Sequence, residues 1–173
     1  MISAISAESS HRVDGLDIFS RTYGWPHFLN AESQIDGCEN EGLWVVEYDC
    51  LVDAERVFRH AETGGTVVWM YPSPDVAKEA GISCKFHQEP ALLSVERRIN
   101  HSSRIQLRTC LKYCTYEGDG LSPYCINSEG LAAIVRQSFG NGEIVWVGVQ
   151  IIDEVVFSRQ GNPHESRETG PLW

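Results

Sequence analysis

The sequence predicts an α+β domain built on a mainly antiparallel sheet of about five or six strands, with two or three helices. Three apolar runs rich in β-branched and aromatic residues, at 43–50, 66–71 and 143–152, are typical of strands. A fourth segment, 104–114, alternates apolar and polar side chains, as a strand with one buried face does. The helical signals are short and do not alternate regularly with the strands, which favours the α+β class.

The totals of the chain fit one globular domain with its own core. With 173 residues, of which 42% are hydrophobic, the chain buries roughly 70% of its unfolded surface on folding. We expect residues 1–158 to form a single α+β domain. Residues 159–173 are polar and contain Gly and Pro, so we expect them to form a flexible tail.

The start of the chain bears on the compartment. Residues 1–10 lack the basic and apolar regions of a secretory signal, and no apolar run approaches the ~20 residues that span a bilayer. We therefore expect a cytoplasmic protein whose six cysteines are reduced thiols rather than a disulfide framework. A signal peptide lost from the start would reverse that expectation.

The regular elements of the first half follow from local signals. Residues 43–50 form the first predicted strand, with acids towards its end. Asp53 is a good N-cap for a helix over 54–61, which Gly64 and Gly65 would end. The next strand, 66–71, is too continuously apolar to be exposed.

The middle of the chain alternates short elements. Ser73 and Pro74 predict the start of a short helix that ends near Ala80. Residues 82–96 predict one or two short strands. In the strand over 104–114, Arg, Lys and Cys side chains share one face and apolar side chains share the other.

The last predicted elements are a loop, a helix and a strand. Residues 115–127 carry Gly, Pro and several polar side chains, which indicates a loop. Ser128 and Glu129 predict the start of a helix that runs to Phe139. The strand over 143–152 has apolar residues on both faces, so we expect it at the centre of the sheet.

Residues 22–55 form an acidic segment, with eight carboxylates and no Lys or Arg. The net charge of the whole chain is −10, which disfavours direct binding to nucleic acid or to anionic membranes. A charge run of this kind is usually a solvated face, and as a functional surface it would attract a basic protein. The expected partner contacts are Asp36, Glu39, Glu41, Glu47, Asp49 and Asp53, with Trp25 or Trp44 as an aromatic anchor.

The opposite pattern occurs later in the chain. Residues 97–116 contain five basic side chains and no acid. The acidic and basic segments could therefore pair with each other, which would leave only a weak field at the surface. Exposed ion pairs of this kind add about 0–1 kcal/mol each to stability.

No cofactor or metal is expected, and the strongest candidate metal set is Cys84, His87, Cys114 and Cys125. These are soft or borderline ligands of the kind that zinc binds in a tetrahedron. Cys110 drops out of this set, because it would lie ~13 Å from Cys114 along one strand. The competing interpretation is that the cysteines are buried as small apolar side chains.

Two catalytic hypotheses remain. Cys110 could be a reactive thiolate, because Arg108 and Lys112 flank it on the same strand face, and His87 could act with it. Glu47, Asp49 and Asp53 could bind Mg²⁺ or Ca²⁺, or act as paired carboxylates. The chain has no nucleophile elbow, phosphate-binding loop or dinucleotide fingerprint.

Two functions follow from these observations. The first is a small acidic binding protein that neutralises a basic partner. It would act as an immunity protein or an inhibitor does, for example against a toxin or effector that acts on nucleic acid. The alternative is an enzyme that uses a Cys/His or carboxylate site on a small substrate.

Overall fold

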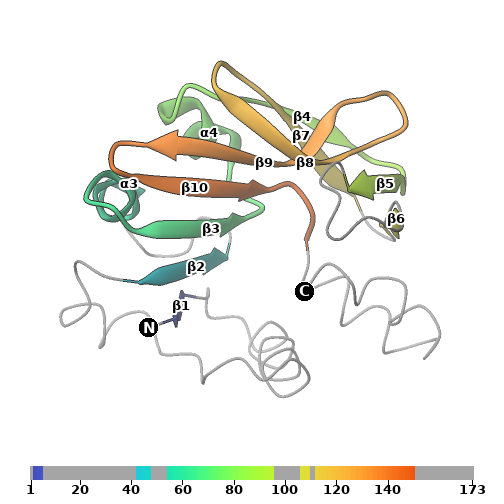
Figure 1. Cartoon of the computed structure of the whole chain (residues 1–173). Helices are drawn as coiled ribbons and strands as arrows, with labels where there is room; N and C mark the ends of the chain where they lie inside the picture. The colour runs from blue at the N-terminus through green and yellow to red at the C-terminus, as the bar shows by residue number, and fades with distance from the viewer. Residues whose placement is uncertain (1, 6–41, 48–53, 96–105, 110–111, 151–173) are drawn as a thin grey trace.

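A single mixed β-sheet runs through the protein (Figure 1). The computed structural model describes residues 2–5, 42–47, 54–95, 106–109 and 112–150, which contribute ten strands and two helices. In chain order the elements are β1 (Ile2–Ile5), β2 (Leu43–Glu47), α3 (Ala54–Glu62), β3 (Thr66–Met70), α4 (Pro74–Glu79), β4 (Ser83–His87), β5 (Leu92–Val95), β6 (Gln106–Arg108), β7 (Tyr113–Glu117), β8 (Leu121–Ile126), β9 (Ala132–Phe139) and β10 (Gly142–Val147).

The sheet combines a parallel part with an antiparallel part. Strands β1, β2, β3 and β10 are paired in parallel, and β9, β8, β5 and β6 follow in antiparallel pairs. Strand β4 pairs with β7, and β7 also contacts β9. The predicted mixture of helices with a sheet is confirmed. The parallel core and the ten strands in the described part correct the expected antiparallel sheet of five or six, and the fold is α/β.

Strands β3 and β10 lie where their composition predicts. Each is apolar on both faces, β3 lies between β2 and β10, and β10 lies between β3 and β9. A parallel pair needs a crossover connection, and α3 provides it between β2 and β3. The helix predicted over 54–61 is thereby confirmed, while its expected cap, Asp53, lies outside the described residues.

The alternation of side chains along the strands divides the core into two clusters. On the face that α3 and α4 cover, Trp69 and Trp146 stack with ring centroids 5.6 Å apart, and Val57 and Ala77 pack from the helices. On the other face, Met70, Leu93, Tyr113, Cys125 and Val147 are among the residues of the second cluster. We call these the helix-side and the far-side cluster.

The short helix predicted after β3 is also confirmed. Ser73 is the N-cap of α4, and its hydroxyl accepts a hydrogen bond from the Val76 N–H at 3.3 Å. Pro74 occupies the first turn, where its missing N–H costs nothing. Neither described helix is long and apolar enough to cross a lipid bilayer.

The single strand predicted over 104–114 is wrong. Strand β6 ends at Arg108 and β7 begins at Tyr113, and the two pair with different partners. Thr109 ends β6 against the chain before β5: its N–H donates to the Ala91 carbonyl at 2.8 Å, and its hydroxyl accepts from the Ala91 N–H at 2.9 Å. The alternating pattern of apolar and polar residues therefore spans parts of two different strands, and it does not mark a single one.

The loop predicted over 115–127 and the helix predicted over 128–139 are also wrong. Both segments are mainly strands, because β9 bonds to β8 on one side and to β10 on the other. Asn127 holds the turn that resembled a helix start. Its side-chain oxygen accepts from the N–H groups of Glu129 and Leu131, each at 2.9 Å. This Asx turn uses the same residue types as an N-cap.

The turn between β9 and β10 packs directly on α3 (Figure 1). The Asn141 N–H donates to the Glu62 carbonyl at 3.0 Å, so the end of the helix and the turn share a hydrogen bond. Gly142 follows, and a Cβ there would overlap the carbonyl oxygens of Gly65 and Ala61. Backbone atoms cannot rotate away as a flexible side chain can.

Gly142→Ala is therefore expected to lower the free energy of unfolding by about 1–3 kcal/mol through overpacking. Urea denaturation followed by circular dichroism measures the change. Gly118→Ala is the matched control, because its added Cβ would meet nothing nearer than the Gly81 oxygen at 3.2 Å. Equal losses in the two variants would contradict the close packing of α3 on this turn.

Candidate functional site

Tyr71 marks the end of β3 as the candidate site. In open sheets with parallel strands, ligands bind beyond the carboxyl ends of those strands. Tyr71 lies at that end of β3, and it is the one non-glycine residue in the described part with a positive φ, 52°. Its N–H donates to the Val147 carbonyl at 2.6 Å, which continues the β3–β10 pairing into the turn before α4. A bulky residue held in this conformation costs about 1–3 kcal/mol, and such strain is common at functional sites.

Two thiols and two phenols gather beside this turn. Strand β4 pairs with β7 so that Cys84 lies opposite Tyr116 and Phe86 lies opposite Cys114. Cys84 and Cys114 therefore share a face of the sheet as diagonal neighbours, with the pair Lys85–Thr115 between their two positions, and their side chains hydrogen-bond to each other. We call Tyr71, Cys84, Cys114 and Tyr116 the thiol–phenol cluster. All four belong to or pack against the helix-side cluster.

The environment sets the ionisation of the cluster. The hydrogen bond from Cys114 lowers the pKa of Cys84, whereas the same bond and burial raise the pKa of Cys114. Burial, with the neighbouring thiols, raises the pKa of Tyr71 to about 12 and holds that of Tyr116 well above its usual value. Within this cluster Cys84 is the group whose pKa is lowered, and the pKa values of the other three are raised.

The predicted metal set does not converge on one site. Cys84 and Cys114 lie with the helix-side cluster, whereas Cys125 is in the far-side cluster. His87 stacks on the Tyr113 ring of the far-side cluster at 4.6 Å. The sheet therefore separates Cys84 and Cys114 from Cys125 and His87, and the structure does not bring the four candidate ligands together. Among the described residues, no group of three His, Cys, Asp or Glu side chains is placed to hold a metal ion.

Most of the predicted partner and catalytic residues remain untested. Asp36, Glu39, Glu41, Asp49, Asp53 and Cys110 lie outside the described residues, and only the backbone of Glu47 is described, in β2. Of the proposed catalytic pair, His87 is described. Its Nε2 atom lies 3.0 Å from the Thr115 hydroxyl.

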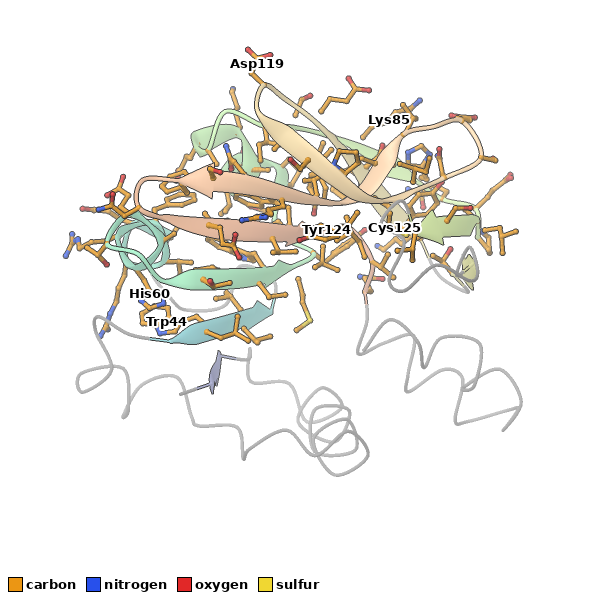
Figure 2. The ribbon with its side chains drawn as sticks, in the orientation of Figure 1. Trp44, His60, Lys85, Asp119, Tyr124 and Cys125 are labelled. Carbon is orange, nitrogen blue, oxygen red and sulfur yellow. The ribbon has the colours of Figure 1, made fainter. Side chains whose placement is uncertain are left out.

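Trp44 is placed clearly, and it is a core residue. Only 2% of it is exposed, and its ring stacks on the buried His60 of α3 with centroids 4.0 Å apart (Figure 2). The His60 Nε2 atom lies 3.2 Å from the Gly42 carbonyl oxygen. A ring buried in this way does not offer a surface anchor, which corrects the expected role of Trp44 in partner binding.

Sequence reasoning missed the thiol–phenol cluster. The available signal was Tyr71-Pro72-Ser73-Pro74, a turn that directly follows a fully apolar strand. That signal locates the turn but not the strain at Tyr71. The Cys84–Cys114 contact depends on the register of β4 with β7, and β7 was predicted partly as a loop.

Comparisons with known proteins identify the fold and nothing finer. No protein-family model matches the chain, and no curated protein matches it. The chain is similar in structure to the exo-β-1,4-mannosidase Op5Man5 from Opitutaceae bacterium strain TAV5, at 12% identity and a TM-score of 0.69, over 99% of this chain and 35% of that one. It is also similar to an α-L-fucosidase from Paenibacillus thiaminolyticus, at 10% identity and a TM-score of 0.69, over 99% of this chain and 32% of that one.

A third match covers nearly all of its counterpart. A glutamine amidotransferase from Thermotoga maritima is 11% identical, with a TM-score of 0.55, over 99% of this chain and 94% of that one. The fold is accordingly that of the glutamine-amidotransferase-like α/β domains. The chain spans about a third of the length of the glycosidases that it matches.

Stability is expected to fall at alkaline pH, because the folded state keeps protons that the unfolded chain loses. Burial raises the pKa of Cys125 from 9.0 to about 12, and that of Tyr71 from 10.0 to about 12. The contribution of these groups is complete below about pH 9 and is lost as pH rises to about 12. The lowered pKa of Cys84 acts in the opposite sense.

We expect at least about 2 kcal/mol of lost stability by pH 11 from these two groups, because a shift of one pKa unit is worth about 1.4 kcal/mol. Urea denaturation between pH 8 and pH 11 measures the decline. Tyr71→Phe and Cys125→Ser should each make it shallower. A decline unchanged in both variants would show that other groups cause it.

Proposed function

We propose that the chain is a non-catalytic binding domain that recognises a basic protein partner through its acidic segment. The observation that carries the proposal is the composition of the thiol–phenol cluster. The strained turn after β3 is where a fold of this class would place its chemistry, and the groups around it are two phenols and two thiols, of which Tyr71, Tyr116 and Cys114 have raised pKa values.

A catalytic thiol at this turn would need a base or a positive neighbour, and the described residues supply neither. The cluster contains no histidine, carboxylate or basic side chain. His87, on the same strand as Cys84, packs against Tyr113 on the far side of the sheet. Among the described residues, the influences on the pKa of Cys84 are the hydrogen bond from Cys114, which lowers it, and burial, which raises it.

The charge of the chain supports the choice of partner. Eight carboxylates and no basic residue occur in 22–55, and the whole chain carries a net charge of −10. In the described part the ion pairs are local: Glu55 pairs with Arg59 at 2.9 Å, and Arg136 pairs with Glu143. Neither joins the acidic segment to the basic segment, so these pairs do not support internal neutralisation.

The comparisons are compatible with a binding role. The mannosidase and the fucosidase are about three times as long as the matched region, so in them this fold accounts for only part of the chain. The finer proposal is an immunity-like or inhibitor-like protein that presents carboxylates to a basic, nucleic-acid-acting toxin or effector. An enzyme using Cys110, His87, Glu47 or Asp49 is the alternative function.

The test compares two charge-reversal variants with the same net charge. The first is Glu39→Lys, Glu41→Lys and Glu47→Lys, within the acidic segment. The control is Glu117→Lys, Asp119→Lys and Glu129→Lys, whose side chains are exposed at the turns around β8 (Figure 2 shows Asp119). Each triple change moves the net charge from −10 to −4.

A partner is first captured from source-cell lysate at low and high salt, then purified and titrated by calorimetry. We expect the first variant to lose at least about tenfold in affinity, because close charge pairs at an interface are worth more than rim charges. The control should lose much less. Equal losses would mean that net charge alone matters. No partner at either salt would contradict the proposal and favour an enzyme.

A further inference from the structure

Cys84 and Cys114 form a thiol pair with an unequal arrangement. Cys114 is 0% exposed and lies on β7, which pairs with β4 and contacts β9. Cys84 is half-buried and lies on β4, whose one partner in the described part of the chain is β7. One thiol is therefore reachable from solvent at a sheet edge, and the other is fixed behind it.

The register brings the thiols into contact without favouring an unstrained disulfide. Diagonal neighbours on antiparallel strands have Cα atoms about 7–8 Å apart, whereas a disulfide needs about 4.4–6.8 Å. Closing the bond requires β4 to shift by about 1 Å relative to β7. An edge strand can make that shift more easily than a strand held on both sides. The resulting bond would be strained, and strained disulfides are readily reduced.

The neighbourhood favours Cys84 as the first thiol to react. The hydrogen bond from Cys114 stabilises its thiolate, and thiolates rather than thiols attack oxidants. The hydrogen bond with Cys84 and burial both raise the pKa of Cys114, so this thiol stays protonated and is the resolving group. Cys125 lies in the far-side cluster, where it cannot reach either sulfur.

We propose that Cys84 and Cys114 are a reversible oxidation site, in which a small peroxide converts the thiol pair into a labile disulfide between β4 and β7. In the first step the Cys84 thiolate attacks hydrogen peroxide, forming a sulfenic acid and releasing hydroxide. In the second step Cys114 displaces the sulfenic oxygen, forming the disulfide and releasing water. Two electrons pass from the thiols to the peroxide.

The bond would act on the strained turn. Phe86, directly opposite Cys114, is 41% exposed, and its ring lies edge-on to that of Tyr71 at 6.0 Å. A shift of β4 moves Phe86 relative to Tyr71, and thus connects the redox state of the pair to the carboxyl end of β3. This site is independent of the acidic segment.

The experiment uses the full chain, reduced, freed of reductant and treated with hydrogen peroxide, then alkylated and digested with trypsin. The expected product is peptide 79–85, which contains Cys84, linked to peptide 113–136, which contains Cys114 and Cys125. Cys110 falls in a separate peptide, 109–112, so a link to it is distinguishable. Reduced glutathione should reopen the bond.

Cysteine variants identify which thiols form the link, and circular dichroism checks that each variant is folded. The link must persist in Cys125→Ser and vanish in Cys84→Ser, with both variants still folded. Cys114→Ala should slow alkylation of Cys84 at neutral pH by about twofold or more, because this variant removes the hydrogen-bond donor that stabilises the Cys84 thiolate. Cys84 left unoxidised in the folded protein, or linked to another cysteine or to a second chain, would overturn the proposal.

Discussion

The pairing of β3 with a parallel strand on each side is the constraint on which the rest of the structure depends. Because β3 lies between β2 and β10, both of its faces must be covered. Trp69 on β3 and Trp146 on β10 meet the helices on one face, with the two rings nearly parallel at 5.6 Å. Met70 and Val147 fill the other face. The parallel arrangement also directs the carboxyl ends of β2, β3 and β10 to one edge, where Tyr71 lies.

The predictions from sequence succeeded where a segment is apolar on both faces or has an unambiguous cap. Strand 66–71 and the helix begun by Ser73 and Pro74 are examples, because burial and capping are local properties. The predictions failed where the same residue types are compatible with two different local structures. The amide side chain of Asn127 and the residues that follow it can start a helix or hold an Asx turn. Only the pairing of β9 with strands on both sides decides between them.

The thiol–phenol cluster could not be predicted from the sequence for a related reason. A prediction of which cysteines meet needs the faces on which they lie, and one misplaced strand boundary reverses that assignment. Treating 104–114 as one strand put Cys110 and Cys114 on a common face and left Tyr116 in a loop. In the structure β7 begins at Tyr113, so Cys114 and Tyr116 face the helix side together. The strain at Tyr71 could be found only from the backbone geometry. The sequence from Tyr71 to Pro74 predicts a turn, but it does not predict the positive φ of Tyr71.

The sheet divides the candidate catalytic and metal-binding side chains between its two faces. The side chains that could cooperate in catalysis or metal binding, Cys84 with His87 or Cys114 with Cys125, lie on opposite faces, separated by the backbone. What the thiol–phenol cluster contains is a set of weak acids, two thiols and two phenols. Two thiols in such a set can exchange electrons through a disulfide, which is the chemistry proposed for Cys84 and Cys114. The proposed oxidation site and the proposed binding through residues 22–55 therefore rest on separate parts of the chain, and each can be tested without the other.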